Sequence, residues 1–162
     1  MDRNKRIGDD AYFMLQAVKE AYKAKEAQEV PIGAVIVKDR KIIARGFNKC
    51  ISSLDPTAHA ENVALRKAAK KLKNYRLNNC YIYVTIEPCI MCLGALINAR
   101  IKRVTFGAFD RKAGACSAYR ITEHKKFNHK IEITGEKEKY LSSKCAEIIK
   151  DFFNEKRTKN KK

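Results

Sequence analysis

The chain has 162 residues, of which 45% are hydrophobic, so we expect one folded domain and not a disordered chain. Its 35 Lys and Arg against 18 Asp and Glu give a formal net charge of +17, which favours a polyanion such as nucleic acid as partner, although Lys is also a common surface residue. The sequence contains no apolar run of the roughly 20 residues that span a bilayer. No apolar segment follows the charged residues 1–6, as one would in a secretory signal. We therefore expect a cytoplasmic protein without a membrane anchor.

Hydrophobic spacing predicts alternating helices and strands. Residues 9–25 carry apolar side chains at helical spacing, and the apolar runs 32–37 and 42–47 around a polar turn predict a hairpin. The further predicted elements are a helix over 57–72 capped by Thr57, a strand over 80–86, a helix over 88–99, a strand over 104–108, a loop or short broken helix over 109–128, a weak strand over 131–134 and a helix over 140–153.

This order of elements predicts the α/β fold class. Strands that alternate with helices favour a mostly parallel sheet with helices on both faces, and the antiparallel hairpin should lie at one side. No internal repeat or second boundary divides the chain, so we expect one domain over residues 1–155 and a frayed basic tail over residues 156–162.

Two short segments carry the residue types of a metal site. His59 lies in segment 55–61, and Cys89 and Cys92 lie in segment 88–92, and each segment opens a predicted helix. The two cysteines share one face of the first helical turn, where the positive end of the helix dipole should lower the pKa of both thiols. Three protein ligands leave a tetrahedral zinc one position for water, which ionises near neutral pH and would supply a hydroxide nucleophile. We therefore expect one zinc ion per chain in an open, catalytic site.

Glu61 is the natural proton shuttle of such a site, because it lies two residues after His59. Two residues within a helix differ by roughly 200° around its axis. His59 and Glu61 can therefore serve one site only if His59 lies at an irregular helix start or if the side chains reach around the helix.

Each part of the pattern has a simpler alternative. A lone His-x-Glu is common, and Cys-x-x-Cys also fits a redox pair or half of a structural zinc site. The other cysteines are expected to be buried free thiols, although any of them is a possible fourth ligand: Cys50, Cys80, Cys116 and Cys145.

The combined H-x-E and P-C-x-x-C pattern resembles that of the zinc-dependent nucleobase deaminases. From about Val30 to Phe153 the chain is similar to bacterial tRNA-specific adenosine deaminases, including segments 74–77 and 104–108. The resemblance implies a cytidine deaminase-like fold over residues 1–155, with three α/β/α layers and a mixed five-stranded sheet. It also implies a homodimer that converts adenosine to inosine at the wobble position of a tRNA anticodon stem-loop, in bacteria usually that of an arginine tRNA.

The resemblance also implies roles for individual residues. His59, Cys89 and Cys92 would hold zinc, and Glu61 would move protons. The implied substrate contacts are Asn48 at the flipped base or its ribose, Val30 in the pocket wall, the amide of Ala60 at the reacting centre, Asp110 at a neighbouring nucleotide, and Phe153 with Arg157 on the last helix. The sequence departs from the family pattern at Leu93, where a small residue is usual, and at segment 117–119, where another glycine is usual.

Two other functions fit parts of the sequence. The same zinc chemistry could act on free guanine, cytidine or deoxycytidylate, none of which requires so positive a protein. A non-catalytic RNA-binding subunit stabilised by zinc would also explain the charge, but it gives Glu61 no evident task.

Overall fold

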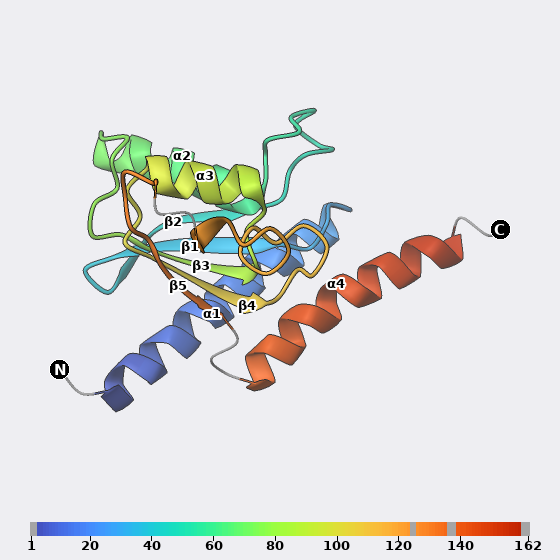
Figure 1. The fold of residues 1–162 in the computed structure, drawn as a ribbon. Coiled ribbons are helices and arrows are strands. Elements are labelled where there is room, and N and C mark those ends of the chain that lie inside the picture. The colour runs from blue at the N-terminus through green and yellow to red at the C-terminus, as the bar shows by residue number, and fades with distance from the viewer. Residues whose placement is uncertain (1–2, 124–125, 136–138, 160–162) are drawn as a thin grey trace.

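The computed structural model describes residues 3–123, 126–135 and 139–159, with side chains described from residue 9 onward (Figure 1). Within these ranges the helices are α1 (Arg3–Glu26), α2 (Ala60–Leu72), α3 (Ile90–Asn98) and α4 (Lys139–Lys159), with a short 3-10 helix η1 (Ile121–Glu123). The strands are β1 (Gly33–Lys38), β2 (Lys41–Phe47), β3 (Tyr81–Ile86), β4 (Arg103–Ala108) and β5 (Glu132–Gly135). None of the described helices is both long and apolar enough to cross a membrane.

The five strands form one mixed sheet in the order β2-β1-β3-β4-β5. Strands β1 and β2 form the predicted antiparallel hairpin, which lies at one side of the sheet. Strand β1 is also antiparallel to β3, whereas β3, β4 and β5 run parallel to one another. The sheet was predicted to be mostly parallel, but only two of its four strand pairings are parallel. The reason is that β1 is antiparallel to both of its neighbours.

Helices cover both faces of the sheet and produce the three α/β/α layers. Helices α2 and α3 lie together on one face, and α1 and α4 lie on the other (Figure 1). Two glycines permit the close approach of these layers, because a Cβ at Gly33 would overlap the backbone of α1 and a Cβ at Gly46 would overlap that of α2. Fully buried strand residues such as Ile36 and Ile82 fill the space between sheet and helices, and each such side chain contributes roughly 1.5–3 kcal/mol to folding.

Several predicted helix ends differ from the structure, since α1 begins at Arg3 and not at residue 9, and α3 begins at Ile90 and not at residue 88. Helix α2 begins at Ala60 with His59 as its N-cap, and Thr57 is not the cap, because its amide and hydroxyl both donate to Asp55 Oδ1 in the preceding turn. Helix α4 continues through Lys159, so residues 156–159 are helical and not frayed, while residues 160–162 lie outside the described residues. The domain division between residues 155 and 156 stays a prediction, although α4 crosses it without a break.

Candidate active site

Four segments that carry predicted site residues leave the sheet at one edge. Ile86, at the end of β3, pairs with Ala108 at the end of the parallel strand β4. Gly33, at the start of β1, pairs with Phe47 at the end of β2 and lies beside the end of β3, because β1 is antiparallel to both strands. The residues that follow or precede these strand ends are Val30, Asn48, Cys89 and Asp110.

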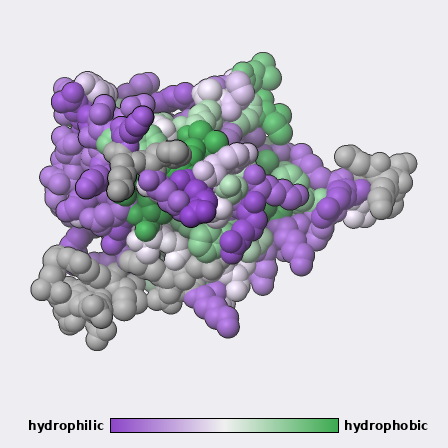
Figure 2. Space-filling view, in the orientation of Figure 1, coloured by the Kyte–Doolittle hydropathy of each residue, from purple (hydrophilic) through white to green (hydrophobic). Residues whose placement is uncertain are grey.

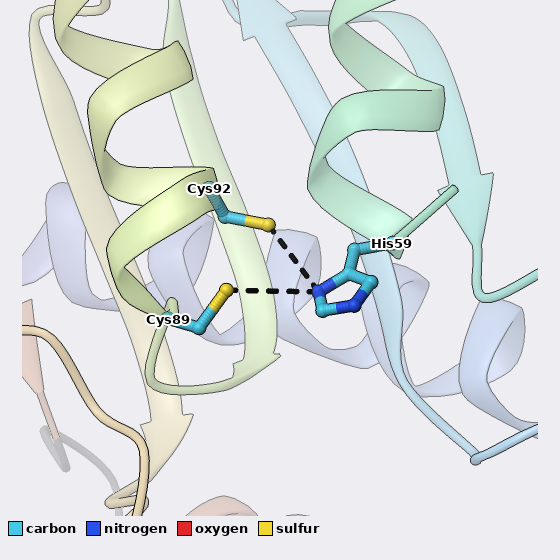
Figure 3. A group of neighbouring side chains, drawn as sticks. All are labelled: His59, Cys89 and Cys92. Carbon is cyan, nitrogen blue, oxygen red and sulfur yellow. Dashed lines mark hydrogen bonds between the residues drawn. The ribbon is translucent and has the colours of Figure 1, made fainter. Parts of the chain in front are cut away.

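His59, Cys89 and Cys92 form a compact group of possible metal ligands (Figure 3). The Nδ1 atom of His59 lies 3.7 Å from Cys89 Sγ and 3.5 Å from Cys92 Sγ. A tetrahedral zinc that binds sulfur at about 2.3 Å and nitrogen at about 2.0 Å separates those two ligand atoms by roughly 3.5 Å. The spacing and the donor set therefore fit zinc.

The two cap positions explain how helices α2 and α3 direct these side chains to one point. His59 is the N-cap of α2 with extended backbone angles (φ −68°, ψ 154°), and Cys89 is the N-cap of α3 in a similar conformation (φ −72°, ψ 172°). His59 thus lies before the first helical residue, so the direction of its side chain does not follow the helical spacing. Glu61, in contrast, lies in the first turn of α2. The geometric condition for His59 and Glu61 to serve one site is met.

No fourth protein ligand joins this group within the part of the chain that the structure describes. Cys80 and Cys145 are buried among apolar side chains, and all six cysteines are free thiols. Three ligands without a fourth agree with an open site and not with a closed structural one.

The two thiols differ in acidity. The pKa of Cys89 falls to about 4, chiefly because the Cys92 thiol donates a hydrogen bond to its sulfur, with His59 as a further partner. The same hydrogen bond raises the pKa of Cys92, and the interaction with Cys89 raises the pKa of His59. The prediction that the helix start acidifies both thiols is therefore wrong for Cys92. A metal that binds here must displace the protons of Cys92 and His59.

Glu61 is buried in the first turn of α2, with 3% of its surface exposed. Burial, together with the negative charge of Cys89, raises the pKa of this carboxyl group to about 7, against an opposing effect of the Glu61 backbone amide. A carboxyl group that titrates near neutral pH both accepts and releases a proton readily, as a proton shuttle requires.

Asn48 and Ala60, both predicted to face the substrate, contact each other. The buried side chain of Asn48 accepts a hydrogen bond from the Ala60 amide through Oδ1, over 3.2 Å. This bond ties the end of β2 to the first residue of α2. The Ala60 amide is thus directed by Asn48, next to both His59 and Glu61.

The other predicted contacts lie on other segments and differ in exposure. Val30 is half-buried ahead of β1, and the partly buried Asp110 accepts the amides of Lys112 and Ala113 in its own loop. On α4, Phe153 is 45% exposed and Arg157 is exposed, with its guanidinium donating to Asn154.

Sequence patterns did not single out two buried carboxylates near this edge. Glu29 follows α1 and accepts the amides of Ile51 and Ser52, while Glu87 precedes Pro88 and accepts amides of segment 110–117. The available signal was an acidic residue shortly before a proline: Glu87 directly precedes Pro88, and Glu29 lies two residues before Pro31. Leu93, where the sequence departs from the family pattern, is buried against Ile97 and Ala115.

Comparison with known proteins shows what this chain resembles. The family model of the cytidine and deoxycytidylate deaminase zinc-binding region matches residues 7–108. A tRNA-specific adenosine deaminase of Buchnera aphidicola subsp. Schizaphis graminum is 47% identical over 154 residues, which are 91% of this chain and 96% of that protein.

Two solved structures share both fold and sequence with this chain. One, from studies of A-to-I editing by tRNA:A34 deaminases at the wobble position of transfer RNA, is 41% identical with a TM-score of 0.80, covering 85% of this chain and 99% of the other. The other, a guanine deaminase from Bacillus subtilis, is 42% identical with a TM-score of 0.56, covering 75% of this chain and 70% of the other.

Proposed function

Because the chain belongs to the zinc-binding cytidine and deoxycytidylate deaminase family, we propose that it hydrolyses adenosine to inosine at the wobble position of a tRNA anticodon, with release of ammonia. The observation that carries the chemistry is a buried carboxyl group with a pKa of about 7, Glu61, beside the group of His59, Cys89 and Cys92. The choice of substrate is supported by the tRNA-specific adenosine deaminases among the relatives, which align along nearly the full length of this chain.

In the proposed reaction three residues hold the metal and a fourth moves protons. Zinc bound by His59, Cys89 and Cys92 would supply a Lewis acid that activates water near neutral pH. Glu61 takes one proton from the attacking water and delivers it to a ring nitrogen of adenine. It then takes the second proton from the added oxygen and gives it to the amine, which leaves as ammonia while the carbonyl group of inosine forms. Asn48 would hold the flipped nucleoside, and Val30 and the Ala60 amide would line the same pocket.

Exposed cations and one exposed aromatic ring support an RNA substrate. Arg111 and Lys112 are exposed next to Asp110, and the last turns of α4 carry the exposed Arg157 and Lys159 close to Phe153. Phe153 offers an exposed ring for stacking on a base, whereas its neighbour Phe152 is buried in the fold. With a formal net charge of +17, the protein attracts the phosphates of an anticodon stem-loop. An arginine tRNA remains the expected species from the family resemblance.

Exposed apolar residues near the site support the proposed homodimer. In the segment between β2 and α2, Ile51 is 61% exposed and Leu54 is 91% exposed, and this segment projects from the body with apolar atoms at its tip (Figure 2). Ile90 and Met91, which follow Cys89, are also partly exposed. Apolar side chains gathered at one edge of a molecule favour burial against another protein, and a second copy would cover them beside the site.

Sedimentation of the wild type and of Leu54→Asp tests the proposed homodimer. We expect the wild type to sediment as a dimer and the variant as a monomer, and a monomeric wild type would contradict the proposal.

One assay separates the proposed activity from its alternatives. The zinc-loaded protein is incubated with a stem-loop RNA that carries adenosine at the wobble position and, in parallel, with free guanine, cytidine and deoxycytidylate. Inosine in the RNA and no reaction of the small substrates is the expected result. Deamination of guanine alone would favour an activity like that of the Bacillus subtilis relative, and no reaction at all would favour a non-catalytic subunit.

We further propose that the protein acts in the cytoplasm, where tRNA is modified in bacteria.

A further inference from the structure

Glu87 lies between strand β3 and Cys89, and its carboxylate is buried against segment 110–117, with 2% of the residue exposed. Its Oε1 atom accepts the amides of Cys116 and Ser117, over 2.9 and 2.6 Å. Its Oε2 atom accepts the amide of Asp110 over 3.1 Å and the Ser117 hydroxyl over 2.6 Å. One side chain thus supplies the hydrogen-bond acceptors for both ends of the segment.

These four hydrogen bonds leave Glu87 no capacity for the substrate. An ionised carboxylate has roughly four lone-pair positions, two on each oxygen, and here each oxygen already accepts two hydrogen bonds. Bonds from backbone amides to a buried charge are also stronger than bonds between neutral groups. Glu87 is therefore suited to holding structure, in contrast to Glu61, whose carboxyl group faces the ligand group.

Further contacts join the same segment to the first cysteine of the metal group. Gly114 pairs with Cys89 in an isolated β-bridge, and the Ala115 amide donates to the Pro88 carbonyl over 2.9 Å. A Cβ atom at Gly114 would overlap the carboxylate of Glu87, so only glycine permits this close approach. The segment is thus fixed directly beside Cys89.

We propose that Glu87 is a positioning residue, which holds segment 110–117 beside Cys89 as a wall of the substrate pocket and thereby sets the affinity for the RNA. This inference rests on the proposed function. The segment carries Asp110 and the exposed cations Arg111 and Lys112, and these groups can contact a nucleotide next to the target only while the segment keeps its place. Because Glu87 acts through the segment and not on the reacting atoms, its loss should affect binding of the RNA more than the chemical step.

The variant Glu87→Gln tests this inference. Glutamine has nearly the volume of glutamate, but its NH2 group is a hydrogen-bond donor and would face backbone amides that are donors as well. The expected result is a KM for the wobble-adenosine stem-loop that rises about tenfold, a kcat within about threefold of wild type and zinc still near one per chain. Hydrogen exchange of the Cys116 and Ser117 amides should become faster in the zinc-loaded variant. Glu132→Gln, at an exposed carboxylate on β5, is the matched control and should leave all four quantities unchanged.

Ser117→Ala gives a second, milder test if Glu87→Gln does not fold, because it removes one of the four hydrogen bonds and should raise KM by about threefold. An unchanged KM and unchanged amide exchange in an active protein would overturn the inference. Loss of zinc together with kcat would also overturn it, since Glu87 would then act on the metal group. A wild type that does not deaminate the RNA would instead count against the proposed function, and the exchange of the two amides would still decide whether Glu87 holds the segment.

Discussion

The amide of Ala60 donates its hydrogen bond to Asn48 Oδ1, so the first residue after β2 holds the first residue of α2. Both partners are buried, with exposures of 0% for Ala60 and 5% for Asn48. A buried amide that loses its acceptor costs about 1–3 kcal/mol. The position of His59 and Glu61, one residue to either side of Ala60, therefore depends on Asn48.

Asn48→Ala should lower kcat/KM for the RNA by roughly 10²-fold, because small displacements of catalytic groups have effects of this size. Asn48→Asp is the informative partner, since its carboxylate still accepts the Ala60 amide but lacks the Nδ2 donor. We expect the aspartate variant to recover the thermal stability lost in the alanine variant without recovering activity. Wild-type activity in Asn48→Asp would show that Asn48 serves the fold alone.

Glu61→Gln should lower kcat on the order of 10³-fold, because the amide cannot accept and release protons. The substitution keeps the size of the side chain and leaves His59, Cys89 and Cys92 in place, so zinc should remain near one per chain. Inosine formation under single-turnover conditions and metal analysis of the same sample measure the two effects. A variant that retains a tenth of the activity would remove Glu61 from the mechanism.

Removal of zinc should destabilise the protein, because the metal would join the starts of α2 and α3, two elements distant in sequence. A metal present at about a thousand times its dissociation constant stabilises the fold by about 4 kcal/mol, which corresponds to roughly 10 °C in the melting temperature of a chain of this size. Thermal denaturation with and without a chelator measures this difference. His59→Ala should abolish it, while His129→Ala, at a ring that contacts the Ile101 carbonyl, should preserve it. An equal loss in both variants would contradict the ligand set.

Glu29 should make stability depend on pH in the acidic range. Burial acts to raise the pKa of Glu29, but hydrogen bonds from Ser52 and Ile51 outweigh it and hold the pKa below its ordinary value of 4.5. A carboxyl group whose pKa is lower in the folded state stabilises the fold above its ordinary pKa, and this contribution disappears as the pH falls through the folded value.

Glu29→Gln should therefore reduce the free energy of unfolding by about 2 kcal/mol at neutral pH, and by progressively less as the pH falls below 4.5. Denaturant unfolding of both proteins across that range gives the comparison. Glu26→Gln, at an exposed carboxylate at the end of α1, should show neither effect. A destabilisation by Glu29→Gln that stays constant down to the lowest pH would argue against the lowered pKa.

Several structural features followed from local sequence patterns. The strands and helices were predictable because alternation and helical spacing are short-range properties, and the spacing of Cys89 and Cys92 predicts their common face on one helical turn. The residue types of segments 55–61 and 88–92 pointed to zinc before any tertiary contact was known. Predicted helix ends were less accurate, as at Thr57, because Asp55 competes for the same hydrogen bonds.

Only the tertiary structure decided which residues support that chemistry. Asn48 and Ala60 are 12 residues apart, and Glu87 and Ser117 are 30 residues apart, so no local period links them. Their contacts arise because the end of β2 and the parallel ends of β3 and β4 meet at one edge of the sheet. The sequence by itself determined which residues we predict as ligands and proton shuttle, since these predictions depend on residue type and near spacing. The sheet determined what holds them in place, because burial and long-range hydrogen bonds exist only once the chain has folded.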